Sequence, residues 1–189
     1  MVGGSSIRQR LESIDSRQVN PGLDRIHELL EVLGNPQLDY PTAIIGGTNG
    51  KGSVAAMLTA VGRAAGHRIG LYTSPHLTAV EERFQINETP ISVSGLDTQL
   101  EFVFAAVDKH LDSPPSYFEI LTAAAFRYFS EAQVDLAVLE VGLGGRWDAT
   151  NVTRPKVAVI SSVAIDHQEY LGNDVETVSY THLTLPTKA

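Results

Sequence analysis

The sequence predicts a three-layer α/β domain in which a mostly parallel sheet is covered by helices on both faces. Short apolar segments alternate with longer segments of helical periodicity, and this alternation is typical of parallel sheets. Two of the apolar segments, residues 134–142 and 156–163, are almost uninterrupted, as expected of strands that are buried on both sides. A glycine-rich turn joins the first strand to the next helix.

The N-terminal part of the chain begins with a predicted helix within residues 21–36. Its leucine and isoleucine side chains recur at helical spacing, Pro21 suits a first turn, and Gly34 suits an end. Residues 42–47 are a short apolar segment ending in two glycines, which predicts a buried strand. Residues 51–66 are rich in alanine and predict a helix.

The central part continues the alternation. Residues 68–74 predict a second apolar strand, and residues 82–92 predict a hairpin or a loop because turn-forming residues lie in their middle. A helix is expected at residues 94–111, with Ser94 as its N-cap. The helix expected at residues 116–132 is apolar around most of its circumference, which indicates that it packs on two sides.

The composition limits the class of protein. The chain has 189 residues, enough for one core, and its 14 basic and 22 acidic residues give a net charge of −8. An acidic chain without a basic segment does not favour nucleic acid as a partner. The sequence has no cysteine, which excludes disulfides and zinc–thiolate sites. No apolar segment has the length of a signal peptide or a membrane span, so we expect a cytoplasmic protein without a membrane partner. We also expect a monomer.

Polar residues follow each of the predicted parallel strands. Residues 46–53 follow the first strand, Ser74 the second, Glu140 the third, and Asp166 and His167 the fourth. In sheets of this kind ligands bind outside the carboxyl ends of the strands. The four stretches are therefore expected to meet at one edge of the sheet and to form a ligand site there.

The stretch GGTNGKGS, residues 46–53, resembles a phosphate-binding loop with altered spacing. Gly50 precedes Lys51 as in the usual G-x-x-x-x-G-K-[ST] pattern, but Gly52 follows it, and the hydroxyl of Ser53 comes one place later. Glycines allow backbone N–H groups to approach a phosphate at a helix N-terminus, and Lys51 adds a cation. The predicted nucleotide-binding residues are Thr48, Asn49, Gly50, Lys51, Gly52 and Ser53.

The loop resembles that of the Mur-type ATP-dependent ligases. More narrowly, the chain resembles the dihydrofolate synthase/folylpolyglutamate synthase family, through segments that run in order from about residue 20 to residue 172. The segments YTSPHL, residues 72–77, and GLGGRWDATN, residues 142–151, favour this folate branch over ligases that act on muramyl peptides. The resemblance implies the P-loop NTPase-like central domain of the Mur ligases.

The resemblance implies a reaction and its ligands. ATP phosphorylates a carboxylate of dihydropteroate or folate, and the amine of L-glutamate attacks the acyl phosphate to form an amide. Lys51, Glu140 and His167 are the implied catalytic residues, and Ser74, Glu140 and His167 match the metal-binding positions. Oxygen ligands suit Mg²⁺, whereas the imidazole of His167 suits a second, softer-ligated ion. The candidates for this second site are Mn²⁺ and K⁺.

The resemblance also implies three substrate-binding stretches, which would contact the pterin. Their residues are Gly22, Leu23, Asp24, Arg25, Ser116, Tyr117, Phe118, Glu119, Trp147, Asp148 and Ala149. His76 and Arg83 lie in segments that match the family, but no role follows for them.

The match to the family ends at Val178. We expect residues 1–177 to form the ATP-binding domain and residues 178–189 to be a non-native tail, because VSYTHL resembles a translated sequencing adapter. The family's second, glutamate-ligating domain is not found in the sequence, so the chain is expected to be inactive alone. Two alternatives stay open: a fragment of a Mur-type peptidoglycan precursor ligase, and a non-catalytic ATP-binding module.

Overall fold

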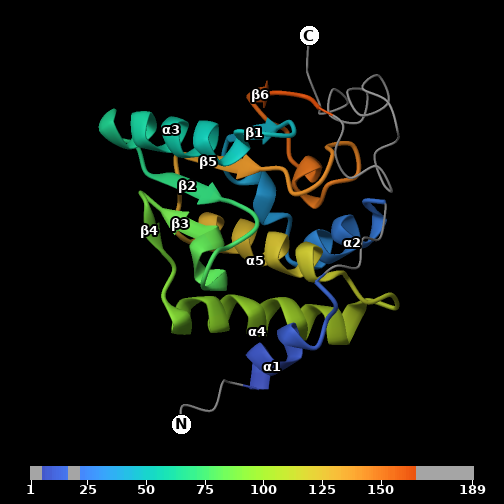
Figure 1. Cartoon of the computed structure of the whole chain (residues 1–189). Coiled ribbons are helices and arrows are strands. Elements are labelled where there is room, and N and C mark those ends of the chain that lie inside the picture. Colours follow the sequence, from blue (N-terminus) through green and yellow to red (C-terminus); the bar gives the residue numbers. More distant parts are fainter. Residues whose placement is uncertain (1–5, 17–21, 165–189) are drawn as a thin grey trace.

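The computed structural model describes residues 6–16 and 22–164, and its centre is one mixed sheet (Figure 1). The strands of this part of the chain are β1 (Thr42–Gly46), β2 (Ile69–Tyr72), β3 (Phe84–Ile86), β4 (Thr89–Pro90), β5 (Leu136–Glu140) and β6 (Val157–Ile160). Their order is β4-β3-β2-β5-β1-β6. The last four strands in this order pair in parallel, and β3 and β4 add an antiparallel edge. The predicted, mostly parallel sheet is confirmed.

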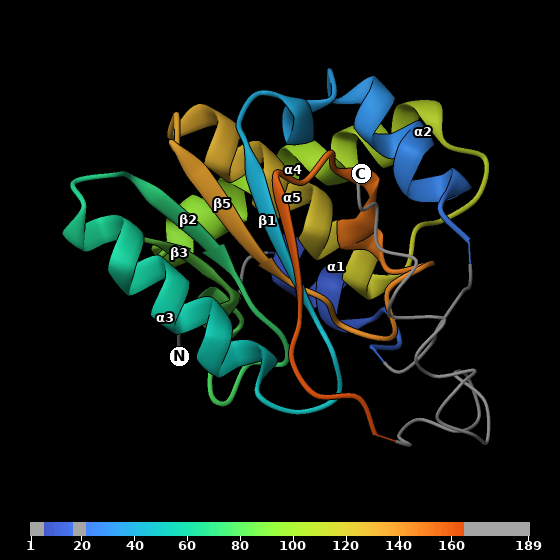
Figure 2. The ribbon, with the colours of Figure 1, turned by 90° about the horizontal axis from the view of Figure 1, so that it is seen from above.

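Helices cover both faces of the sheet, as predicted. They are α1 (Ser6–Glu12), α2 (Asp24–Val32), α3 (Lys51–Ala64), α4 (Val93–His110) and α5 (Tyr117–Glu131), with short 3-10 turns η1 (Pro36–Leu38), η2 (Val80–Arg83) and η3 (Ala149–Val152). Figures 1 and 2 show α3 on one face and α5 with α2 on the other. Helix α4 packs on the side of α5 that faces away from the sheet, and α1 packs on α4. No helix in the described ranges has both the length and the apolar character that a membrane crossing needs.

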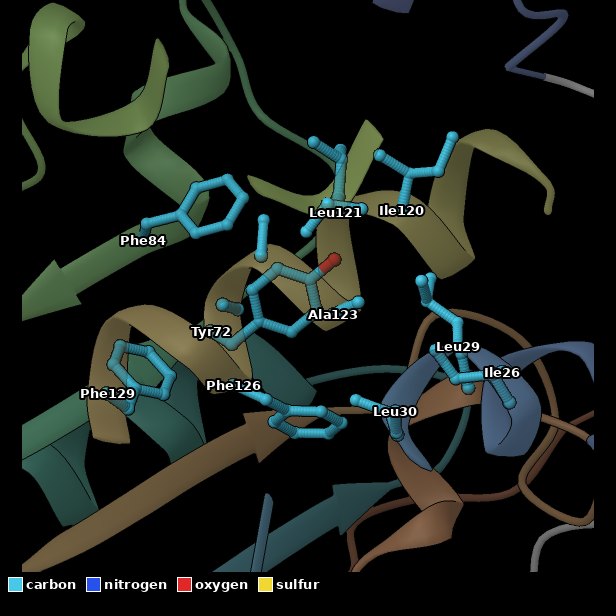
Figure 3. Packing of buried hydrophobic residues seen from close by; sticks show 14 of the residues in the cluster. Ile26, Leu29, Leu30, Tyr72, Phe84, Ile120, Leu121, Ala123, Phe126 and Phe129 are labelled. Carbon is cyan, nitrogen blue, oxygen red and sulfur yellow. The ribbon is translucent and has the colours of Figure 1, made fainter. Parts of the chain in front are cut away.

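The larger core lies between the sheet and α5 (Figure 3). Helix α5 is buried on most of its sides because the sheet covers one side and α4 the other, which confirms the prediction from its apolar circumference. Phe126 and Phe129 are fully buried there, and the hydroxyl of Tyr72 lies 3.3 Å from that of Thr122. A smaller apolar cluster, which includes Ile45 and Leu71, fills the space under α3.

The expected hairpin at residues 82–92 is present as β3 and β4. Its turn places Asn87 at φ 49° and Glu88 at φ 66°, and Asn87 Oδ1 accepts a hydrogen bond from the N–H of Ile69 at 2.8 Å. This side-chain bond ties the turn to the start of β2. The antiparallel edge is thereby fixed against the parallel part of the sheet.

The predicted N-cap of α4 is wrong. The helix begins at Val93, and the cap is Ser92, whose hydroxyl accepts a hydrogen bond from the N–H of Gly95 at 3.0 Å. Both Ser92 and Ser94 satisfy the residue preference of an N-cap. The hydrogen bond of Ile91 selects Ser92 as the cap. The N–H of Ile91 donates to the carbonyl of Phe84, and the helix starts directly after this bond.

Candidate functional site

Three of the four predicted polar stretches meet at the carboxyl edge of the parallel strands. The loop 46–53 follows β1, Glu140 ends β5, and Ser74 follows β2. The N–H of Ser74 donates to Glu140 Oε2 at 3.1 Å, and a Cβ at Gly52 would lie 3.6 Å from Glu140 Oε1. The fourth stretch, with Asp166 and His167, lies outside the described residues, so its prediction is not tested.

The loop leads into the N-terminus of α3 without a side-chain cap. Gly47 and Gly50 have φ values of 121° and 82°, which favour glycine. Gly50 occupies the N-cap position and offers no side chain to the N–H groups of the first turn. These N–H groups and the positive end of the helix dipole suit an anion.

Lys51 lies over the loop that it follows. Its Nζ donates to the carbonyl oxygens of Gly47 at 2.8 Å and Thr48 at 3.3 Å. Both acceptors are uncharged, so these hydrogen bonds do not neutralise the positive charge of Lys51 beside the helix N-terminus. Asn49 and Ser53 are exposed on the same loop and first turn. This arrangement of the loop residues is compatible with a phosphate site, which stays a prediction.

The segment after β6 is hydrogen-bonded to the loop 46–53, and this contact was not predicted from the sequence. The N–H of Thr48 donates to the carbonyl of Ser162 at 2.6 Å, and the hydroxyl of Thr48 bonds both to the N–H and to the carbonyl of Ala164. A Cβ at Gly47 would lie 2.3 Å from Ser161 Oγ. The glycine is thus needed for close packing as well as for its backbone conformation. The small residues at 161 and 162 were the available signal.

Glu140 is a buried carboxylate at this edge. It is 6% exposed, it accepts a hydrogen bond from the N–H of Ser74, and the N–H of Gly52 also acts on its charge. Burial raises the pKa of the Glu140 carboxyl, while these N–H groups and the charges of Lys51 and Arg83 act in the opposite direction. A buried carboxylate beside a phosphate site would gain from a divalent cation, which removes the cost of burying its charge.

The predicted metal ligands are brought together only in part. Ser74 and Glu140 are joined by the hydrogen bond between them, and their oxygens are of the type that Mg²⁺ prefers. Within residues 6–16 and 22–164, no group of three acidic, histidine or cysteine side chains could hold a metal ion. The fit to Mg²⁺ therefore rests on these two residues and on oxygens that a nucleotide would bring.

The first two stretches predicted to bind substrate meet at the starts of α2 and α5. Gly22, Leu23 and Asp24 lead into α2, and Arg25 Nε lies 3.3 Å from Glu119 Oε2. Glu119 also caps α5 with Ser116, whose N–H it accepts at 2.6 Å. The other oxygen of Glu119 is buried and has no hydrogen-bond partner. It could therefore accept a hydrogen bond from a ligand.

The third stretch packs beside the second. A Cβ at Gly142 would lie 2.8 Å from the ring of Phe118 and 3.2 Å from Asp148 Oδ2. The carboxylate of Asp148 accepts hydrogen bonds from the N–H groups of Gly142 and Leu143 and from the N–H and hydroxyl of Thr150. Burial raises the pKa of this carboxyl.

The residues of the third stretch differ in their access to a ligand. The Asp148 carboxylate is directed into its own loop and holds residues 142–150 in shape. Ala149 is 4% exposed, whereas the side chain of Trp147 is 51% exposed and lies beside Arg146, whose Cζ is 4.9 Å from its ring centroid. Among Trp147, Asp148 and Ala149, Trp147 is therefore the side chain that a ligand reaches most easily.

A glycine loop at a helix N-terminus, beside a buried carboxylate at the carboxyl edge of parallel strands, is an arrangement typical of nucleotide-binding α/β domains. The sequence model of the Mur ligase middle domain matches residues 45–185 of this chain. The match covers most of the chain and includes the loop and Glu140. The chain belongs to the Mur ligase family.

Within this family the chain is similar to enzymes of folate metabolism. It is 43% identical over 182 residues to dihydrofolate synthase/folylpolyglutamate synthase of Mycobacterium tuberculosis, covering 91% of this chain and 37% of that protein. The solved structure of Mycobacterium tuberculosis folylpolyglutamate synthase complexed with ADP and AMPPCP matches with a TM-score of 0.87 at 41% identity, over 95% of this chain and 40% of that one.

A third match is the solved structure of Escherichia coli FolC in complex with DHPP and ADP. Its TM-score is 0.88 at 35% identity, and the match covers 94% of this chain and 42% of that one. The α/β fold inferred from the sequence is therefore confirmed by solved structures. The chain spans about two-fifths of the length of these relatives.

Proposed function

We propose that this chain is the ATP-binding part of a ligase that joins L-glutamate to dihydropteroate or a folate through an acyl phosphate. The observation that carries the proposal is the contact of Glu140 with both the glycine loop and Ser74, together with the pairing of Arg25 and Glu119 at the starts of α2 and α5. The relatives complexed with ADP, AMPPCP and DHPP support it.

Each group in the site has a role in this proposal. The N–H groups of the loop and of the first turn of α3 bind the phosphates of ATP, and Lys51 turns from its loop carbonyls to the transferring phosphate. Ser74 and Glu140 would hold Mg²⁺, which neutralises charge on the phosphates when bound. The pterin lies against the starts of α2 and α5 and beside Trp147. His167 stays a predicted ligand of a second ion.

The nucleotide part of the proposal is tested by binding of Mg·ADP to the chain. Lys51→Met should weaken binding roughly 10-fold or more, because it removes a charge-assisted hydrogen bond to phosphate. Lys109→Met, in the last turn of α4, is the matched control and should bind as the unchanged chain does. Equal affinity of the two variants would contradict a phosphate site at residues 46–53.

The substrate part is tested by offering the same chain two ligands. Binding of dihydropteroate, but not of a UDP-linked muramyl peptide, is the expected result. The opposite preference would assign the chain to a Mur-type peptidoglycan precursor ligase. Nucleotide binding without either ligand would favour a non-catalytic ATP-binding module.

A further inference from the structure

The side chain of Arg83 is buried, yet most of its guanidinium has no hydrogen-bond partner in the described part of the chain. Arg83 is 8% exposed, and its Nε donates to His76 Nδ1 at 2.9 Å. Its two terminal amino groups donate to no described residue. Because an uncompensated buried charge is costly, a guanidinium in this state is expected to serve a ligand.

The backbone around Arg83 is held firmly. The N–H of Thr73 donates to the Arg83 carbonyl at 3.1 Å, and the next residue, Phe84, is fully buried in β3. Glu82 accepts the N–H groups of residues 77–79, which fixes the loop that carries His76. His76 in turn occupies Nε. Only the outer edge of the guanidinium, with its two amino groups, is left for a ligand.

Arg83 lies between the two halves of the proposed site. Its Cζ is 5.8 Å from the ring centroid of Tyr117, at the start of α5, where the pterin is proposed to bind. Its charge also acts on Glu140, as does that of Lys51. Lys51 and Arg83 are thus two cations that act on the same buried carboxylate.

We propose that the two terminal amino groups of Arg83 bind the carboxylate of the substrate. The inference rests on the proposed function, which needs an ionised carboxylate held between the pterin side and the phosphate loop. A planar guanidinium edge matches a carboxylate with two parallel hydrogen bonds, which fixes its orientation as well as its position. Arg83 is thus the residue that selects an acid rather than an uncharged pterin.

The test compares dihydropteroate with its carboxamide, in which an uncharged amide replaces the carboxylate. Their dissociation constants are measured by equilibrium dialysis for the unchanged chain, Arg83→Met, Arg83→Lys and Arg127→Met. Arg127 is the matched control because it is also partly buried and stacks on an aromatic ring, that of Phe102, farther along α5. Methionine keeps much of the length of the arginine stem while removing its charge.

The unchanged chain and Arg127→Met should prefer the acid by roughly 10- to 100-fold, the range of charged hydrogen bonds. Arg83→Met should abolish this preference and leave binding of the carboxamide within about threefold. Arg83→Lys should restore part of the preference, because it returns the charge without the planar edge. If Arg83→Met does not fold, Arg83→Lys still tests the proposal through a preference reduced severalfold.

Two results would overturn the proposal, and they differ. If Arg83→Met keeps the preference for the acid, Arg83 does not bind the carboxylate, and the proposed function stands. If the unchanged chain binds neither ligand, or binds both equally, the proposed substrate fails together with the role of Arg83.

Discussion

At the residue scale, glycines with similar backbone conformations have unequal importance. Gly47 and Gly66 both have positive φ, 121° and 88°, but a Cβ at Gly47 would lie 2.3 Å from Ser161 Oγ and 2.9 Å from the Ser162 carbonyl. A Cβ at Gly66 meets nothing within 4 Å. The two positions therefore separate backbone strain from steric clash.

We expect Gly66→Ala to lower the free energy of unfolding by about 1 kcal/mol, which is the cost of a left-handed conformation. Gly47→Ala should lower it by about 3 kcal/mol, because overpacking adds to that cost. Urea denaturation of both variants measures the difference. Equal losses would show that the loop does not depend on close packing against the segment after β6.

Two glutamates should have opposite effects on stability as the pH changes. Burial raises the folded-state pKa of Glu140 above its ordinary value of 4.5, so the stability that it contributes is present at acid pH and lost as the pH rises through the folded value. Backbone N–H groups of Leu77 and Ala79 lower the pKa of Glu82, so its contribution is present above 4.5 and lost as the pH falls.

The corresponding glutamine variants test this sign. At pH 7, without metal or nucleotide, Glu140→Gln should raise the free energy of unfolding by about 1 kcal/mol, because it removes a buried charge whose burial destabilises the folded chain. Glu82→Gln should lower it at the same pH. Denaturation between pH 4 and 8 measures both, and a loss of stability in Glu140→Gln would contradict the account of a buried, costly carboxylate.

At the element scale, the start of α4 distinguishes a residue preference from an actual contact. Ser92→Ala should lower the free energy of unfolding by about 1 kcal/mol, because it removes the acceptor for the N–H of Gly95. Ser94→Ala lies inside the helix and should change it by less than about 0.5 kcal/mol. Thermal unfolding followed by circular dichroism compares the two variants. A larger loss of stability in Ser94→Ala would show that Ser94, as predicted from the sequence, is the N-cap.

Most of the elements could be predicted from the sequence because their signals are local, whereas helix α1 was not predicted. The alternation of strands and helices, the glycine loop before Lys51 and the polar residues after β2 and β5 all lie within short segments. What could not be predicted depends on partners distant in sequence. Asp148 holds its own loop, Ser162 supports Thr48, and Arg83 is buried beside His76 because of the tertiary packing around them.

At the scale of the whole molecule, helices on opposite faces of the sheet position the two halves of the site. Helix α3 covers one face and brings its N-terminus to the carboxyl edge, whereas α5 and α2 begin on the other face (Figure 2). A ligand at that edge is therefore in reach of both. We therefore expect a nucleotide and a pterin acid to occupy neighbouring positions rather than one shared position.

The most direct test of this claim is calorimetric titration of dihydropteroate into the chain saturated with Mg·ADP. We expect dihydropteroate to bind at one site per chain while the nucleotide stays bound. Lys51→Met should weaken the binding of the nucleotide and leave the binding of dihydropteroate in place. Displacement of the nucleotide by dihydropteroate, or no pterin binding at all beside a tightly bound nucleotide, would contradict a site in which the two substrates meet.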